Sequence, residues 1–459
     1  MRLTRAQRWS WRGVLWLMMS WILLLGSARI VDAQPASTPV EPVLRLEDLE
    51  RMALEQNPTL PQARATVRAA EGRYTQAGIY PNPLIGYALE DFNARKPGRN
   101  KHFFWFQVPI VTAGKLQRSQ NLAAADRQHA EVSAEAQRLR VLTTVRMLYY
   151  EALGAARVVV LRAELARLVR EAVDVSEQLF NVGQADRPDV LEVEIQSQRT
   201  ELDLARAQTD QERVWRALAA MVGSPALPLT ALAGDLEVNV PQLDREAIIA
   251  KVLRESPEVR LAQINVERAR AALERVRAER IPNFFVRTRL GYNSEPFAAG
   301  GDVGFEGGLE IGIPLPLFDR QQGNITNAEA DLEHTRGEVR RLELALRSQL
   351  TAAIKRYEDA RGEVERYQRQ ILPRAREAFE LYRKRFQQMA AAYPQVIIAE
   401  RALYDARAEY VRALIDVWQG ATLFDGLLLR GGLEAPAHAT VQPPPPSGHL
   451  PSPAGRPAN

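Results

Sequence analysis

The sequence predicts a mainly α-helical protein that also carries transmembrane β-strands. Two stretches of about 65 residues, 115–180 and 325–388, carry apolar residues at helical spacing. Two pairs of short segments alternate apolar and polar residues, as strands with one apolar face do. The same order of segments occurs twice, so each half is predicted to be one copy of a helix, β-hairpin and long-helix unit.

Residues 1–33 are predicted to be a secretory signal peptide. Basic residues precede a short apolar run, 14–26, and small residues follow it. Cleavage is expected after Ala33, or alternatively after Ala28. An uncleaved membrane anchor is the other interpretation, but the run is shorter than the roughly 20 residues that a spanning helix needs.

The basic charge of the chain lies mainly in this leader. The whole chain has 60 Lys+Arg against 56 Asp+Glu, a net charge of +4. Removal of 1–33 takes away five arginines and one aspartate and leaves 55 basic and 55 acidic side chains. Nucleic acid is therefore not an expected partner. The sequence has no cysteine, which excludes disulfides, thiolate metal sites, thiol catalysis and a lipid anchor on an N-terminal cysteine.

Helical patterns occupy most of the chain. They are expected at 46–78, 115–180, 189–221, 246–280, 325–388 and 395–425. Pro373 is expected to kink the fifth of these. A helix of about 65 residues is roughly 100 Å long at 1.5 Å per residue, which indicates coiled-coil packing. A cytosolic coiled-coil scaffold is the alternative, and the signal peptide and the strands argue against it.

Paired motifs define the internal repeat. Asn57-Pro58 recurs as Ser256-Pro257, and Tyr80-Pro81-Asn82 recurs as Ile281-Pro282-Asn283. Phe180, Pro188 and Val190 recur in the same way as Phe386, Pro394 and Val396. The first repeat is placed at 34–240 and the second at 241–430. Residues 431–459, which are rich in proline, are predicted to be a disordered tail.

The predicted strands are 83–92 and 102–110 in the first half, and 283–293 and 303–313 in the second. One face of each strand is apolar, and the other carries arginine and glutamate in the second half. A transmembrane barrel and a soluble hairpin with one solvated face both produce this alternation. About eight strands are the minimum for a barrel, so four membrane-spanning strands require several chains to share one.

The strands supply two groups of candidate functional residues. Arg287, Arg289, Glu306 and Glu310 are expected on the polar face, where they would line the barrel lumen and influence which charged solutes pass. Cross-strand pairing of glutamate with arginine is the alternative role. An aromatic belt at the membrane interface is expected from Phe103, Phe104, Trp105, Phe106, Tyr292 and Phe305. Core packing is the alternative for these aromatic residues.

These residues resemble the TolC-like family of bacterial outer-membrane efflux factors over about residues 45–428. The motifs that carry the resemblance are Asn57-Pro58, Tyr80-Pro81-Asn82-Pro83 and the run IPLPLFDRQQGNI at 313–325. The last run resembles most closely the heavy-metal (cobalt–zinc–cadmium type) branch of the family.

The resemblance implies a homotrimer in which three protomers contribute four strands each to a 12-stranded barrel joined to an α-helical periplasmic tunnel. It implies a passive exit duct, not an enzyme, in the lipid of the outer membrane of a Gram-negative bacterium. The implied partners are a periplasmic adaptor protein and an inner-membrane RND-type pump, and the implied cargo is heavy-metal cations. Export of drugs or secreted polypeptides stays open, as does an exported scaffold without a pore.

The resemblance also places a periplasmic tip at about 180–190. Gly183, Asp186, Arg187 and Asp189 lie there and are candidates for a gate or an adaptor contact. Helix capping by aspartate is the alternative. The second tip, at about 386–396, has Met389 and Gln395 where the first has Gly183 and Asp189, which argues against a symmetric acidic gate.

No catalytic or cofactor site is expected. The histidines are scattered, at His102, His129, His334, His438 and His449, and none has the i, i+4 partner that metal sites often use. After signal removal the methionines, Met52, Met147, Met221 and Met389, lie far apart and are expected to fill the core.

Overall fold

The computed structural model describes residues 43–91, 100–296, 300–388 and 392–434. The expected signal peptide, most of the proline-rich tail and Met389 lie outside the described residues. From Leu44 onward the described elements belong to one compact unit, so the two repeats do not form separate domains. Within the described residues, no helix combines the length and apolar character that crossing a bilayer requires.

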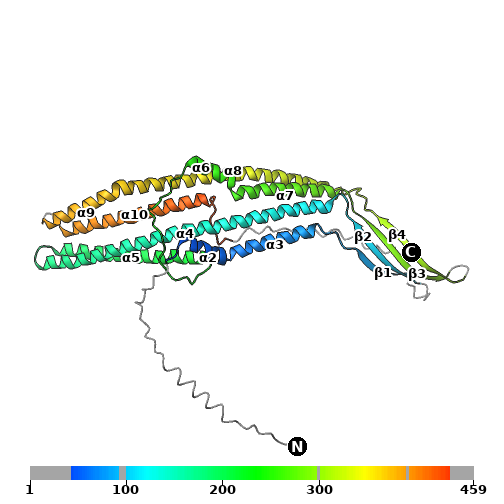
Figure 1. The fold of residues 1–459 in the computed structure, drawn as a ribbon, viewed down its shortest axis with the longest axis horizontal. Helices are drawn as coiled ribbons and strands as arrows, with labels where there is room; N and C mark the ends of the chain where they lie inside the picture. Colours follow the sequence, from blue (N-terminus) through cyan, green and yellow to red (C-terminus); the bar gives the residue numbers. More distant parts are fainter. Residues whose placement is uncertain (1–42, 92–99, 297–299, 389–391, 435–459) are drawn as a thin grey trace, which may run out of the picture. The chain divides into compact units, whose positions relative to one another are not determined.

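The protein is mainly helical, as predicted, and its elements come in a similar order in the two halves (Figure 1). The first half contains α2 (Leu46–Gln56), α3 (Thr59–Ala77), β1 (Leu84–Glu90), β2 (Lys101–Ile110), α4 (Lys115–Asn181) and α5 (Arg187–Met221). The second half contains α6 (Arg245–Glu255), α7 (Pro257–Glu279), β3 (Phe284–Pro296), β4 (Asp302–Gly312), α8 (Gln322–Arg366), the π-helical segment η1 (Tyr367–Ile371), α9 (Leu372–Gln387) and α10 (Tyr393–Asp425).

Two helices expected to be continuous are each broken by proline. The expected helix 46–78 is α2 and α3, because Asn57 has an extended backbone and Pro58 cannot donate a helical hydrogen bond. The expected helix 246–280 is likewise α6 and α7, separated at Ser256-Pro257. Near Pro373, where a kink is expected, the helix contains the π-helical segment η1, which accommodates the missing N–H of that proline.

The helices of the two halves pack on one another around α4. This 67-residue helix contacts α2, α3 and α5 of its own half and also α7 and α10 of the second half. One buried cluster joins α4, α8 and α10 through residues such as Leu165, Leu350 and Leu414. A second cluster joins α2, α4 and α5 through Leu49, Val145 and Leu218. Apolar burial along these seams is what holds the long helices side by side.

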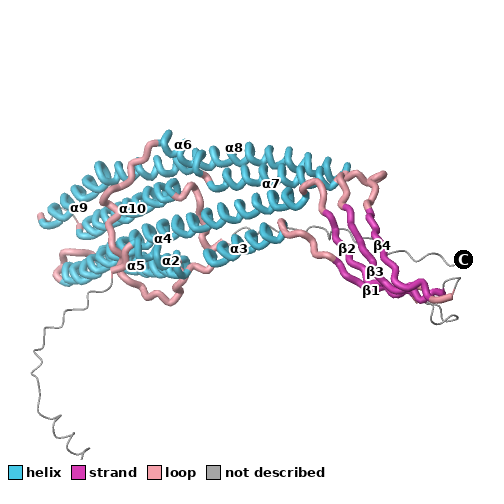
Figure 2. The backbone as a smooth tube through the Cα atoms, turned by 45° about the vertical axis from the view of Figure 1, so that its right-hand side comes forward, coloured by secondary structure: helices cyan, strands magenta, loops and turns pink. Residues whose placement is uncertain are grey.

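The four strands form one antiparallel sheet in the order β1-β2-β3-β4. Figure 2 shows the strands side by side where α3 and α7 end and where α4 and α8 begin. The central pair, β2 and β3, comes from different halves of the chain. Among the described strands, β1 and β4 have a partner on one side only, so both edges of the sheet are open.

Gly223 ends α5 in a conformation that favours glycine. Its φ is +81°, and its N–H and that of Ser224 donate to the Ala220 and Ala219 carbonyls, a Schellman motif. A Cβ at this position would lie 2.5 Å from the Gln56 carbonyl oxygen.

Gly223→Ala is therefore expected to lower the free energy of unfolding by about 1–3 kcal/mol. Gly72→Ala is the matched control, because Gly72 is an exposed residue inside α3 with nothing near its Cβ position. It should be neutral or stabilise by up to about 1 kcal/mol. Thermal unfolding followed by circular dichroism measures both, and equal effects would contradict the assignment.

Candidate functional site

The sheet has one apolar face, and its side chains are exposed. The strand register places Tyr87 beside Phe104, Phe104 beside Leu290, and Tyr292 beside Phe305. Leu290 is 71% exposed and Phe305 is 90% exposed. We define the apolar face as Ile85, Tyr87, Leu89, Phe104, Phe106, Leu290, Tyr292, Phe305, Leu309 and Ile311. So large an exposed apolar surface marks a contact with lipid or with another chain.

The opposite face, the polar face, carries an ion pair and a buried amide. Arg287 Nη1 lies 3.1 Å from Glu310 Oε2, its directly opposed residue on β4. Arg287 Nε and Nη2 also donate to Gln107 Oε1, at 2.9 and 2.6 Å. Gln107 is buried, and a buried amide oxygen needs a hydrogen-bond donor, which the Arg287 guanidinium supplies. The cross-strand alternative is therefore observed for this pair.

The other two charged candidates on this face are not paired with each other. Arg289 opposes Gly308, and its guanidinium lies over the Phe103 ring, 5.2 Å from the centroid. Glu306 accepts a hydrogen bond from Asn293 Nδ2 at 2.9 Å. All four charged candidates thus share one face, as predicted. Of these four, Arg287 and Glu310 are the two that form an ion pair among the described residues.

The expected aromatic belt is wrong for Phe103 and Trp105. Successive residues of a strand point to opposite faces, so these two side chains lie on the polar face, away from Phe104 and Phe106. Phe103 is 4% exposed and covers Gly291, while Trp105 covers Gly86. Each glycine leaves room for the ring across from it. These two aromatic residues are packed within the sheet, which was the alternative role.

The remaining belt residues share the apolar face. Phe104 and Phe106 are exposed there, and the Tyr292 and Phe305 rings meet edge to face at 5.5 Å. The Tyr292 hydroxyl donates to Asp302 Oδ2 at 3.1 Å. His102 lies in β2, within the expected strand 102–110, and its Nδ1 is 2.5 Å from the Tyr87 hydroxyl.

At the first tip, Gly183 ends α4 with a φ of +73°. The Gly183 and Gln184 N–H groups donate to the Phe180 and Leu179 carbonyls, a Schellman motif. The chain turns and α5 begins at Arg187, with Asp186 as its N-cap. Asp189 Oδ2 accepts from the Asp186 N–H at 3.4 Å, and Arg187 Nη1 lies 3.6 Å from Glu194 Oε1. The capping alternative for Asp189 is therefore present in the structure.

The second tip is built without carboxylates at the cap. Ala392 is the N-cap of α10, Pro394 follows Tyr393, and Gln395 occupies the position that Asp189 has in α5. Phe386 and Tyr393 instead pack across the turn with their ring centroids 4.8 Å apart. The helices α5 and α10 thus begin alike, with an extended N-cap residue and a proline at the second position, but with different side chains at the third.

The matching family model carries the description Outer membrane efflux protein and covers residues 49–224 and 248–419. The chain belongs to this family. The two matched segments correspond to the two halves of the fold, and each runs from its short helices through its hairpin to its last helix.

A relative of this outer membrane efflux protein is the cobalt-zinc-cadmium resistance protein CzcC of Cupriavidus metallidurans. The two are 25% identical over 387 residues, which is 84% of this chain and 90% of CzcC. Among solved structures, the outer-membrane channel OprN matches with a TM-score of 0.71 at 18% identity, over 85% of this chain and 91% of OprN. CusC matches with a TM-score of 0.69 at 17% identity, over 83% and 91% of the two chains. The structural likenesses establish the shared fold.

The structure of this efflux protein also contains a network of charged side chains that the sequence did not reveal. Arg162 Nη1 of α4 lies 2.5 Å from Asp405 Oδ1 of α10. Arg401 Nε lies 3.7 Å from Asp405 Oδ2, and Arg401 Nη2 lies 3.6 Å from Asp203 Oδ2 of α5. Arg401 Nη1 also donates to Gln196 Oε1 of α5. This network connects α4 with α10 and α10 with α5, the two helices that begin at the tips. The i, i+4 spacing of Arg401 and Asp405 is the only signal in the sequence for it.

No metal-binding cluster of three or more histidine or acidic side chains exists within the described ranges. His129 on α4 and His334 on α8 lie on different helices. Burial lowers the pKa of His129, so its neutral form is favoured.

Burial also shifts the pKa of one acidic residue, Glu400, which lies in α10. It raises the pKa of Glu400 above its ordinary value of 4.5, and the nearby Glu164 carboxylate adds to the shift. The folded state therefore binds more protons than the unfolded state in the pH range above 4.5. Stability is gained as the pH falls through the raised pKa and lost as the pH rises through it.

Glu400→Gln is expected to raise the melting temperature at neutral pH and to flatten its dependence on pH above 4.5. Glu338→Gln is the control, because Arg341 lowers the pKa of that exposed carboxyl and the sign is reversed. Melting temperatures between pH 4.5 and 8 measure the effect. An unchanged profile in Glu400→Gln would show that this carboxyl is not desolvated.

Proposed function

We propose that this chain is the outer-membrane exit duct of a tripartite efflux system and that it works as a homotrimer. The observation that carries the proposal is the two-faced sheet with two open edges. Three copies would join β4 of one to β1 of the next, closing twelve strands into a barrel and leaving no free edge. The apolar face would meet lipid, and the polar face would line a wet lumen.

The long helices support the second part of the proposal. α4 is 67 residues long, which at 1.5 Å per residue is about 100 Å. Such helices, continuing from the sheet, would form a tunnel through the periplasm toward a periplasmic adaptor and an inner-membrane RND-type pump. The duct itself would be passive, with energy supplied by the pump.

For the cargo, we propose heavy-metal cations. The support is the relation to CzcC, named for cobalt, zinc and cadmium resistance, over most of both chains. Glu306 and Glu310 would place carboxylates along the path of the ions, partly offset by Arg287 and Arg289. Drugs or secreted polypeptides are the alternative cargo for the same fold.

The cargo is tested with a strain that lacks this gene and carries it back on a plasmid. We expect the deletion to lower tolerance to cobalt, zinc or cadmium, and the plasmid to restore it. Unchanged metal tolerance combined with increased sensitivity to drugs would reject the metal cargo and leave the duct intact. Recovery of the protein as a soluble periplasmic species would reject the duct.

The tip can be tested for gating separately from capping. Under the gate hypothesis, Asp189→Ala raises conductance or antibiotic sensitivity. Asp189→Asn removes the charge but keeps an oxygen that can accept from the Asp186 N–H. If the charge closes the tip, both variants open it. If only Asp189→Ala changes the protein, and does so by destabilising the start of α5, Asp189 is a cap and the gate assignment is wrong.

A further inference from the structure

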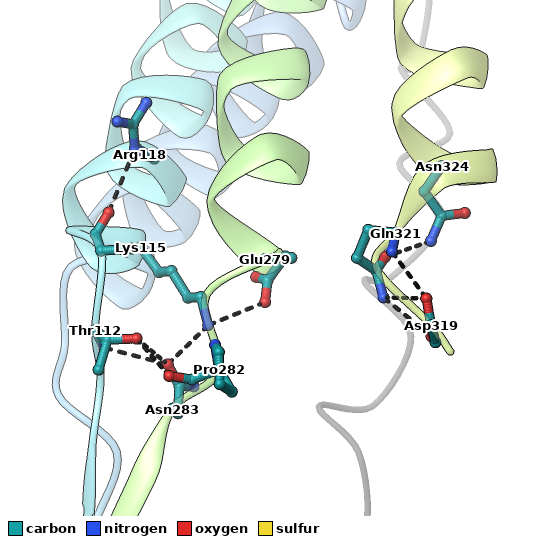
Figure 3. A network of polar contacts seen from close by, with 10 residues as sticks. Thr112, Lys115, Arg118, Glu279, Pro282, Asn283, Asp319, Gln321 and Asn324 are labelled. Atoms are coloured by element: carbon teal, nitrogen blue, oxygen red, sulfur yellow. Dashed lines mark hydrogen bonds and ion pairs between the residues drawn. The ribbon is translucent and has the colours of Figure 1, made fainter. Parts of the chain in front are cut away.

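Where the strands meet the helices, one set of polar contacts joins the two halves of the chain. Asn283, just before β3, accepts at Oδ1 from the Thr112 N–H at 3.2 Å and from Lys115 Nζ at 2.8 Å. The Thr112 hydroxyl donates to the Pro282 carbonyl at 2.8 Å, and Lys115 Nζ lies 3.4 Å from Glu279 Oε2. Figure 3 shows Asn283 between Thr112 and Lys115. We call these five residues the junction clamp.

The internal repeat supplies a second set of residues for the same clamp. Asn82 precedes β1 in the motif that places Asn283 before β3. Gly114 and Gln321 both precede a long helix, and both have a φ of +60°. This equivalence aligns Thr112 with Asp319 and Lys115 with Gln322. Asn82, Asp319 and Gln322 are thus the counterparts of Asn283, Thr112 and Lys115.

The second clamp is not formed within one chain. Asn82 lies at the start of edge strand β1, and Asp319 follows the other edge strand, β4. Among the described residues, the Asp319 carboxylate oxygens accept only from Gln321 in the same turn, as Figure 3 shows. The Gln322 side chain likewise bonds only within this turn, to the Arg320 N–H and the Phe318 carbonyl, and one N–H of its amide is left for a further acceptor. Across the described residues, Asn82 is exposed and makes no hydrogen bond. The two halves of the clamp therefore lie at opposite edges of the sheet.

Exposed apolar residues lie beside this incomplete clamp. Phe318 is 90% exposed, whereas its counterpart Val111 is partly buried. The Val111 N–H donates to the Tyr80 hydroxyl at 3.0 Å. Leu315 and Leu317 are also exposed. A solvent-exposed aromatic side chain next to an open sheet edge indicates a surface that another chain covers.

We propose that Asn82 of one copy completes the clamp with Asp319 and Gln322 of the next copy, so that the partner at this surface is a second copy of this chain. The chemistry is complementary: the Asn82 amide can donate to the Asp319 carboxylate, and its oxygen can accept from the Gln322 amide. The start of β1 in that copy would also cover Phe318. This inference rests on the proposed homotrimer and assigns its contact at the junction.

The absence of cysteine in the chain permits a direct test by paired cysteines. Asn82→Cys combined with Asp319→Cys is expected to give disulfide-linked dimers and trimers in oxidised membranes, and neither single variant should give the ladder. Thr112→Cys with Asn283→Cys is the matched control within one chain. It should give a cross-linked monomer, which shows that the clamp geometry permits a disulfide.

The outcomes separate this inference from the proposed function. A trimer seen by light scattering that fails to cross-link through positions 82 and 319, while the control pair links, would overturn the clamp and keep the duct. A protein that is monomeric in detergent and in membranes would overturn both.

A charge exchange gives a second readout that does not need oxidation. Asn82→Asp would place a carboxylate against Asp319 of the next copy and should lower the temperature at which the trimer dissociates on gels. Adding Asp319→Asn should restore that temperature, because the amide again meets a carboxylate. Loss in the single variant without recovery in the double variant would contradict the clamp.

Discussion

Leu290→Arg is expected to prevent assembly of the protein in the outer membrane. Leu290 lies at the middle of β3 on the apolar face and is 71% exposed. If this face meets lipid, a guanidinium here costs about 2–4 kcal/mol per copy near the membrane midplane, and a trimer would contain three copies. The measurement is the amount of heat-resistant trimer in isolated outer membranes.

Glu306→Lys on β4 is the matched control for Leu290→Arg. It also introduces a basic side chain into the sheet, but on the polar face, where Glu306 contacts Asn293. We expect normal assembly, with at most a change in ion selectivity. Equal assembly of Leu290→Arg and Glu306→Lys would show that the apolar face does not contact lipid.

Asn57→Ala is expected to destabilise the helical part of the protein by about 3 kcal/mol. Asn57 is fully buried between α2 and α3. Its Nδ2 donates to the Met221 carbonyl at 2.7 Å, and its Oδ1 accepts from the Thr59 N–H at 3.0 Å. The substitution leaves these buried groups unpaired, at about 1–3 kcal/mol for each one that water does not reach.

The Asn57 contacts belong to a wider network, which is why we expect a global effect. Gln137 Nε2 of α4 donates to the Thr59 hydroxyl at 3.0 Å and to the Gly432 carbonyl at 2.9 Å. The network thus joins α3, α4, the end of α5 and the segment after α10. Asn121→Ala, on an exposed turn of α4, is the control and should change the melting temperature little. A similar small change in Asn57→Ala would contradict the account of the network.

The alternation in the sequence predicted the faces of β3 and β4 correctly, because each pattern is regular enough to define its own register. Leu290, Tyr292 and Phe305 share one face, and Arg287 shares the other with Glu310. The prediction was wrong for Phe103 and Trp105. Residues 103–106 are all aromatic, which hides the alternation, and only the opposing glycines, Gly86 and Gly291, show which rings turn inward.

Contacts between distant segments could not be predicted in the same way. Arg162 and Asp405 are 243 positions apart, and Asn57 meets the end of α5 across 164 positions. Local spacing predicts a helix or a strand, but it does not predict which faces of two helices meet. The breaks at Asn57-Pro58 and Ser256-Pro257 were missed for a different reason. Both prolines stand inside the helical pattern, but the apolar spacing continues across them and suggested one unbroken helix in each half.

Single-channel recording in planar lipid bilayers shows whether this protein forms a pore. The purified protein is predicted to insert as a trimer and to give discrete current steps, whereas Leu290→Arg should give none and Glu306→Lys should conduct. Current steps that appear equally with Leu290→Arg, or a trimer that binds bilayers without passing any current, would contradict the account of a barrel shared between three chains.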